Sequence, residues 1–323
     1  MTTTHPDFTS SVELARLAPS IHNTQPWRFR VDGDRLLLSR DPDRRLAALD
    51  PTGRQQVISC GAALHLARLD LRLQGFDSTV EYGPFDDGGE LLAVVTTVPG
   101  HAVSTEDLSS WRAARSRHTQ RDRFAARTVE PAVVADIRGA AEAQGAWVRV
   151  LGSAEGVATL AVLLAHAEEV ERDDPGYRDE LAAWTHRPAG ARDGLPREAT
   201  PSVAGRASTV RLRDFDVPED DGVSGAADQP PAAEHPLTVV LGTEGDRIVD
   251  WLHAGAALMA MWLRATVAGV QASPLGQVVD LDWSRSRLGL ELGVVGHPQM
   301  VLRLGYGQPG PSTPRRPVSE VLG

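Results

Sequence analysis

The sequence predicts an α+β fold in which two related halves are fused in one chain as a pseudo-dimer. A Gly-Ala-Ala-Leu string lies within a long apolar segment twice, at 61–64 and at 255–258. A glycine follows each string at the same distance, as Gly75 and Gly269. Similar strand patterns surround both segments, and 323 residues with 41% hydrophobic side chains are enough for substantial cores.

The two repeated segments, 60–76 and 254–270, are predicted to be buried central helices. They are apolar around most of their circumference, their small residues allow close approach of another helix, and a glycine ends each one. Asp50 with Pro51, and Asp250, are expected to cap their starts. From the string alone, coincidence in two unrelated helices remains an alternative.

The first half, residues 1–105, is expected to begin with a helix at about 10–18, opened by a capping box of Ser10 and Glu13. Alternating and apolar runs then predict strands at 27–31, 35–39 and 91–98, with the long helix between the second and the third.

The second half, residues 106–323, repeats this pattern with additions. Its expected helices lie at about 130–144 and 153–184 besides the long helix, and its expected strands lie at 147–151, 237–241 and 299–305. A proline-rich insertion at about 186–236 interrupts it. Loops of this length are either surface insertions or functional covers.

Composition limits the classes of function. A net charge of −10 and a pI near 5.5 argue against a general nucleic-acid or anionic-membrane surface. The single cysteine, Cys60, excludes an internal disulfide and a cysteine-cluster metal site, and no metal is expected. Without a signal segment or an apolar run of roughly 18 residues, a cytoplasmic protein is expected.

Residues 18–29 concentrate polar groups in one turn, reading Ala-Pro-Ser-Ile-His-Asn-Thr-Gln-Pro-Trp-Arg-Phe. Ser20, Asn23 and Gln25 bring hydroxyl and amide groups together, with prolines restricting the backbone on either side. Such a turn suits a ring edge rich in carbonyls and nitrogens. A capping turn before a core Trp27 would use the same residue types, so composition alone leaves both interpretations open.

Residues 111–127 carry six arginines in an otherwise acidic chain, which indicates an anionic partner. Guanidinium groups bind phosphate oxygens in pairs, and a nearby hydroxyl adds a donor. A solvated basic face is the alternative. The candidate phosphate ligands are Arg115, Ser116, Arg117 and Arg121, with Thr119 beside them.

The string at 18–29 resembles one carried near the N-terminus by the nitroreductase superfamily, Ala-Pro-Ser-x-x-Asn-x-Gln-Pro-Trp-x-Phe, and matches it at every position. The chain is similar to the fused Acg-like branch along nearly its whole length. The resemblance implies a nitroreductase-like FMN-binding fold, with mixed sheets packed with long central helices. It also implies that the dimer interface is internal, so that the chain can be monomeric, and that the insertion at 186–236 is a lid over the flavin.

The resemblance also assigns the FMN site. It implies that Ser20, Asn23 and Gln25 contact the isoalloxazine or ribityl group, and that Arg115 to Arg121 form an Arg-Ser-x-Arg phosphate motif. Two further segments are assigned in the same way. The loop of Ser273, Pro274, Leu275 and Gly276 would bring backbone amides to the ring, and the final strand would place Arg303 toward the phosphate.

These parts predict one FMN site per chain. The stretch 5–14 contains no arginine, and the second half has no counterpart of the 19–27 loop. The surviving loop and the surviving arginines therefore come from opposite halves, as a site at a dimer interface requires.

The predicted function is that of an FMN-dependent oxidoreductase. Hydride would pass from NAD(P)H to flavin N5 and then to a small-molecule acceptor, a nitro compound, a quinone or a related compound, with no catalytic side chain required. Two alternatives remain: a lidded FMN-sequestering or redox-sensing protein with little turnover, and a non-flavin anion-binding module. Hydrolase, nucleotide-binding and zinc-protease motifs are absent from the sequence.

Overall fold

The computed structural model describes residues 5–83, 89–185, 187–188, 190–196, 199 and 234–323. Most of the expected lid at 186–236 lies outside these residues. Within them, no helix is both long and apolar enough to span a membrane.

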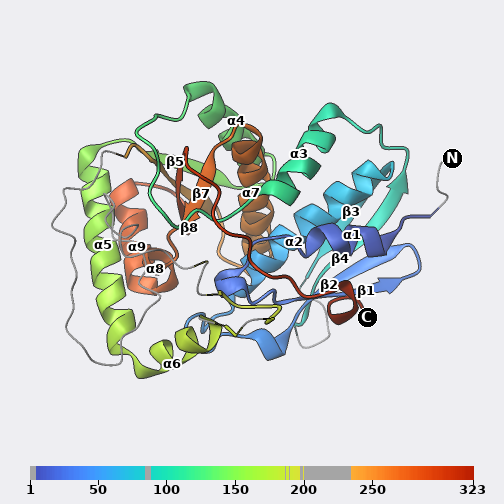
Figure 1. The fold of residues 1–323 in the computed structure, drawn as a ribbon, viewed down its shortest axis with the longest axis horizontal. Helices are drawn as coiled ribbons and strands as arrows, with labels where there is room; N and C mark the ends of the chain where they lie inside the picture. Colours follow the sequence, from blue (N-terminus) through green and yellow to red (C-terminus); the bar gives the residue numbers. More distant parts are fainter. Residues whose placement is uncertain (1–4, 84–88, 186, 189, 197–198, 200–233) are drawn as a thin grey trace.

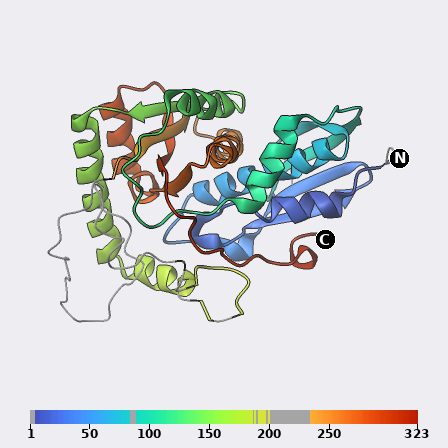
Figure 2. The ribbon, with the colours of Figure 1, turned by 45° about the horizontal axis from the view of Figure 1, so that its top comes forward.

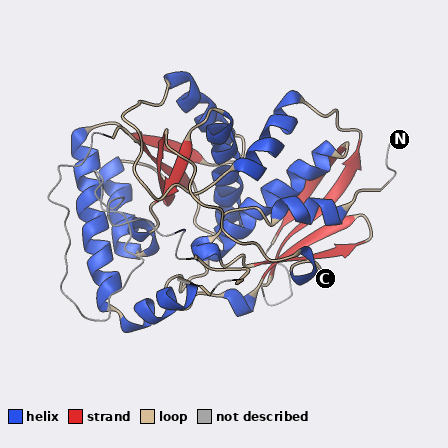
Figure 3. Ribbon diagram, in the orientation of Figure 1, coloured by secondary structure: helices blue, strands red, loops and turns tan. Residues whose placement is uncertain are grey.

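Two four-stranded sheets share one strand order, which is the expected mark of two related halves. The first has the order β1 (Trp27–Asp32), β2 (Arg35–Arg40), β4 (Leu91–Pro99) and β3 (Phe76–Tyr82). The second has the order β5 (Trp147–Leu151), β6 (Leu237–Thr243), β8 (His297–Gly305) and β7 (Gln271–Pro274). Figure 3 shows the two groups of strands apart from each other, with helices between them.

The pairing of these strands corrects one expectation. Neighbouring strands pair in antiparallel fashion in both sheets. Among the described residues, the parallel contacts to these strands are isolated bridges, Phe29 with Leu322 and Thr119 with Ala272. Both sheets are therefore antiparallel, and not mixed as expected.

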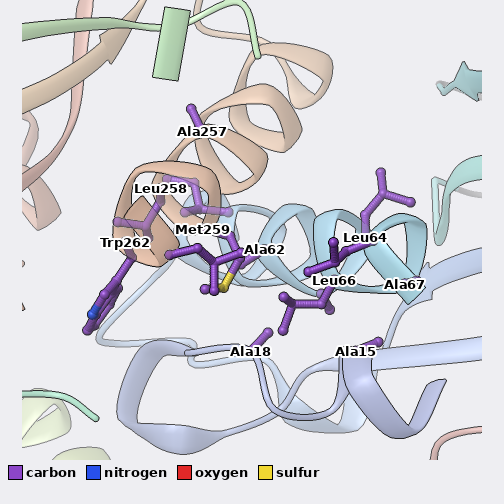
Figure 4. Packing of buried hydrophobic residues seen from close by; sticks show 14 of the residues in the cluster. Ala15, Ala18, Ala62, Leu64, Leu66, Ala67, Ala257, Leu258, Met259 and Trp262 are labelled. Carbon is purple, nitrogen blue, oxygen red and sulfur yellow. The ribbon is translucent and has the colours of Figure 1, made fainter. Parts of the chain in front are cut away.

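The central helices α2 (Arg54–Leu73) and α7 (Ile248–Val267) pack against each other at their glycines. A Cβ on Gly61 would collide with the Leu252 carbonyl, and a Cβ on Gly255 would collide with the Ile58 carbonyl. The repeat equates Gly61 with Gly255 and Ile58 with Leu252, so the two contacts are related by the pseudo-twofold symmetry. Figure 4 shows side chains of both helices in one buried cluster.

The helix starts differ in detail from the expectation. The first helix, α1 (Phe8–Ala15), is capped by Asp7, whose carboxylate accepts from the Ser10 amide, so the capping box of Ser10 and Glu13 does not form. Asp50 does accept from the first-turn amides of Gln55 and Gln56, although the N-cap residue of α2 is glycine.

The remaining helices complete the second half. They are α3 (Thr105–Ser116), α4 (Pro131–Glu142), α5 (Ala154–Asp173), α6 (Pro175–Trp184), α8 (Gln277–Asp280) and α9 (Asp282–Leu292). The ends of α2 and α7 agree with the sequence, because Gly75 and Gly269 adopt positive φ angles of 90° and 73° there.

Candidate functional site

Two adjoining cavities lie where the halves meet. The larger, termed the apolar pocket, encloses about 990 Å³ of empty volume counted to its open mouth. Its walls come from the 19–22 loop, α2, α7, β7 and the segment after β7. The described lining residues are Pro19, Ser20, Ile21, His22, Gln55, Ile58, Ser59, Thr119, Arg121, Leu195, Leu258, Trp262, Ser273, Pro274, Leu275, Gly276, Gln277, Asp280 and Met300.

The smaller cavity, termed the arginine pocket, encloses about 650 Å³. Pro19, Ser20, Thr119 and Arg121 line both cavities, so the two adjoin along these residues. No acidic residue is among its lining residues in the described part of the chain. The described residues that line the arginine pocket are Leu17, Pro19, Ser20, Asn23, Ala114, Arg115, Arg117, His118, Thr119, Arg121, Pro311, Ser312, Thr313 and Arg315.

The loop between the two cavities has a strained backbone. His22, Asn23 and Gln25 have positive φ angles of 42°, 57° and 50°. Left-handed conformations cost non-glycine residues on the order of 1 kcal/mol or more each, and such strain is concentrated at functional sites. The Ser20 hydroxyl stabilises the turn by accepting from the Gln25 amide at 3.0 Å.

Asn23 and Gln25 occupy different places from those expected. Asn23 lines the arginine pocket and not the apolar pocket. Gln25 lines neither: its Nε2 donates to the Arg192 carbonyl at 2.9 Å, and its Oε1 accepts from the Arg316 amide at 2.7 Å. Gln25 therefore holds neighbouring chain segments against the loop and does not face the cavities.

Three arginines gather positive charge around the arginine pocket: Arg117, which is buried, and Arg121 and Arg315, which are partly buried. Burial, together with Arg315 and Arg121, lowers the pKa of Arg117 to about 9. Burial lowers the pKa of Arg121 to about 10. Burial, together with Arg16 and Arg121, lowers that of Arg315 to about 10. A bound anion would compensate this charge, because each guanidinium would regain an opposite partner.

The other two residues of the expected phosphate motif are less central. Arg115 lines the arginine pocket, but its guanidinium lies over the Trp111 ring at 4.3 Å. Ser116 lines neither cavity, and its hydroxyl donates to the Arg112 carbonyl at 3.2 Å. Thr119 supplies the hydroxyl that lines both cavities instead.

The loop after α7 forms one wall of the apolar pocket. Ser273, Pro274, Leu275 and Gly276 all line the apolar pocket. The Leu275 amide already donates to the Val301 carbonyl at 2.8 Å, so it is not available to a ligand. A Cβ on Gly276 would lie 2.9 Å from an Asp280 carboxylate oxygen, and glycine keeps this wall uncrowded.

Arg303 does not reach the arginine pocket, which corrects the expectation for that residue. It is fully buried and forms an ion pair with Glu234 at 2.6 Å. Its guanidinium also lies 5.0 Å from the centre of the Phe124 ring. The position beside the pocket belongs to Arg315, on the C-terminal segment. The only sequence signal for Arg315 was the pair of arginines, Arg315 and Arg316, within a proline-rich stretch.

Sequence reasoning also missed the contribution of the central helices. Gln55 and Ser59 lie one helical turn apart on α2, and Trp262 lies on α7; all three line the apolar pocket. Two polar residues at i and i+4 within a buried helix were the available signal. The Arg117 guanidinium lies 4.6 Å from the Trp262 ring centre, so the Arg117–Trp262 pair connects the walls of the two cavities.

The pseudo-symmetric counterpart of the apolar pocket is built differently. The repeat equates Gly276 with Tyr82 and Ser59 with His253. Tyr82 and His253 pack edge to face, with ring centres 4.9 Å apart. Two rings therefore stand at one of the two pseudo-symmetric positions, and a glycine and a serine stand at the other.

Comparison with known proteins gives consistent family matches. The model of the nitroreductase family matches residues 114–306. A Mycobacterium tuberculosis protein with the name "Putative NAD(P)H nitroreductase Rv3131" is 32% identical over 315 residues, which cover 96% of this chain and 89% of that protein. A second protein of that organism, "Putative NAD(P)H nitroreductase acg", is 30% identical over 322 residues, 97% of this chain and 94% of its own length.

Two solved structures were also found. A nitroreductase with bound FMN from Desulfitobacterium hafniense has a TM-score of 0.40 and 13% identity, over 66% of this chain and 95% of its own. One from Bacteroides fragilis, also with bound FMN, has a TM-score of 0.36 and 13% identity, over 64% of this chain and 92% of its own.

Proposed function

Because the chain belongs to the nitroreductase family, we propose that it is an FMN-dependent oxidoreductase that uses NAD(P)H to reduce a small acceptor. The observation that carries the proposal is that an apolar pocket and an arginine pocket adjoin and share four lining residues. This pair of cavities suits a ligand with a flat ring system at one end and a phosphate at the other.

The donor set fits the chemistry of FMN. Arg117, Arg121 and Arg315 would present their guanidiniums to a phosphate dianion, and compensation of their mutual repulsion would contribute to binding. Ser20 and Thr119, at the junction of the cavities, would hold the ribityl chain through their hydroxyls. The ring would lie in the apolar pocket.

Bound FMN would supply the hydride chemistry, accepting hydride from a nicotinamide and transferring it to the acceptor. The chain's own residues bind and orient the reactants. Leu195, Leu258, Trp262 and Met300 give the pocket apolar walls that exclude water from the ring. The size and apolar character of the pocket support aromatic acceptors such as nitro compounds and quinones.

The site would be shared between halves. Ser20 and the strained loop come from residues 1–105, and the arginines and the 273–276 loop come from residues 106–323. This division supports an internal pseudo-dimer that functions as a monomer, with one FMN per chain. The Tyr82–His253 pair at the pseudo-symmetric position supports the absence of a second site.

A second candidate function is sequestration of FMN, or redox sensing with little turnover. It is favoured by the described part of the insertion, which lies against the site. Leu195 lines the apolar pocket, and the Asn23 Nδ2 donates to the Gly194 carbonyl at 2.9 Å. A ring covered in this way would admit nicotinamide slowly.

Anaerobic stopped-flow mixing separates the two candidates. FMN-loaded protein mixed with NADH or NADPH is expected to lose its visible flavin absorbance rapidly, because an oxidoreductase must accept hydride within turnover. Dithionite serves as the control that any bound flavin can be reduced. Bleaching by dithionite alone would favour sequestration, and failure to bind FMN would contradict both candidates in favour of an anion-binding module.

A further inference from the structure

The last residues of the chain, 307–323, form a strap that crosses from the second half to the first. After β8 the strap crosses to the first half and ends beside β1 (Figures 1 and 2). Four of its residues, Pro311, Ser312, Thr313 and Arg315, line the arginine pocket on the way. Its end is fixed there by two backbone bonds: the Phe29 amide donates to the Val321 carbonyl at 2.6 Å, and the Gly323 amide donates to the Phe29 carbonyl at 2.9 Å. The strap therefore joins the two halves over the site.

On its way the strap contacts the strained loop at 20–25. The Asn23 Nδ2 donates to the Pro314 carbonyl at 3.0 Å, and the Arg316 amide donates to the Gln25 Oε1 at 2.7 Å. The Arg315 Nη1 donates to the Asn23 Oδ1 at 3.0 Å. Two of the loop residues with positive φ, Asn23 and Gln25, are thus held in place by the strap. Loosening the strap would release their strain.

Charge opposes this closed arrangement. Closure of the strap brings the Arg315 guanidinium to the pocket that already holds Arg117 and Arg121. All three are largely buried, and the charges of Arg315 and Arg121 each disfavour the charged form of Arg117. With no acidic residue among the described lining residues, closure costs electrostatic free energy until an anion enters.

We propose that Arg315 is a phosphate-binding residue, and that a phosphate dianion in the arginine pocket stabilises the C-terminal strap against the 20–25 loop. Ligand binding and closure of the strap are then one coupled equilibrium, because the same guanidinium serves both. The identification of FMN as the phosphate source rests on the proposed function. Inorganic phosphate shares the relevant chemistry and is expected to act in the same way at higher concentration.

Hydrogen exchange of the strap measures this coupling directly. Peptides that cover residues 307–323 are followed by mass spectrometry in FMN-free protein alone, with inorganic phosphate, with riboflavin and with FMN. We expect phosphate and FMN each to slow exchange by about tenfold or more, since they stabilise the closed state, and riboflavin to leave it nearly unchanged. Equal protection by riboflavin and FMN, or no protection by phosphate, would overturn the proposal.

Two variants distinguish a phosphate-binding role for Arg315 from a purely structural one. In Arg315→Gln, phosphate should no longer slow exchange, because the guanidinium that would bind it is gone; the ligand-free rate serves only as the baseline, since this variant also loses the hydrogen bonds to Asn23 and Leu17. The matched control is Arg192→Gln: Arg192 is exposed and pairs with Glu320 of the strap at 2.9 Å, but lines neither cavity. In Arg192→Gln, phosphate should slow hydrogen exchange of the strap as much as in the parent.

A retained response to phosphate in Arg315→Gln, or a lost response in Arg192→Gln, would contradict the coupling. The test also separates this inference from the proposed function. Protection by phosphate in a protein that does not bind FMN would leave the strap mechanism intact and refute the flavin function. FMN binding without protection of the strap would refute the strap mechanism and leave the flavin function intact.

Discussion

Replacing Arg117 with glutamine is expected to weaken FMN binding about 100-fold, the loss that follows when a charged hydrogen bond to phosphate is removed from a buried site. Arg117 is 7% exposed and lines the arginine pocket, with its guanidinium over the Trp262 ring. Fluorescence titration of FMN-free protein with FMN gives the dissociation constants.

The control for this variant is Arg112→Gln, on the same helix α3. Arg112 is exposed and lines neither cavity, so its replacement removes an equal charge without touching the site. FMN affinity should then change little. Equal losses in the two variants would mean that the general positive field of 111–127, and not a built phosphate site, attracts the cofactor.

Arg117→Gln also has a distinctive effect on stability. The pKa of Arg117 in the folded state lies below its ordinary value of 12.5, so folding disfavours its charged form. This penalty applies at neutral pH and diminishes as pH rises through about 9, where the folded-state guanidinium begins to lose its proton. Removing the charge relieves the penalty at neutral pH, which offsets part of the packing lost, whereas a given concentration of FMN stabilises the parent more than the variant.

Substituting alanine for Gly61 or Gly255 is expected to lower the free energy of unfolding by at least about 3 kcal/mol, which is large for the addition of one methyl group. The new Cβ would collide with backbone of the opposite central helix, at Leu252 or at Ile58, and backbone cannot move aside as a flexible side chain does. Urea unfolding followed by circular dichroism measures the loss.

Gly139→Ala is the matched control. Gly139 lies inside helix α4, and a Cβ there would meet nothing within 4 Å. Alanine is the better helix former, so this variant should gain up to about 1 kcal/mol. If Gly61→Ala and Gly255→Ala were as stable as Gly139→Ala, close packing of α2 on α7 would be refuted, and with it the internal dimer interface.

Much of the fold could be predicted because its pattern is local. The Gly-Ala-Ala-Leu strings marked both central helices, and the strand at 147–151 agrees with β5 to the residue. The strands β3 and β7 were missed for physical reasons. In β3, Glu81 and Asp77 interrupt the apolar pattern of an edge strand, and β7 has only four residues, including Pro274.

The site was predictable only in part, because a sequence motif shows which residues are close along the chain and not where their side chains point. Ser20, Arg117 and Arg121 do converge on the two cavities. Gln25 points away to hold the C-terminal strap, and Arg303 turns to Glu234, a residue almost seventy positions earlier. Such long-range partners leave no trace in local sequence. Arg315 was missed for the same reason.

The central claim is that one FMN site is assembled from the loop of the first half and the arginines of the second. Titration of FMN-free protein with FMN, at concentrations well above the dissociation constant, tests it most directly. The break in the titration is expected at one FMN per chain, because the pseudo-symmetric position holds the Tyr82–His253 pair and no arginine cluster. A break at two FMN per chain, or no saturable binding, would contradict the account.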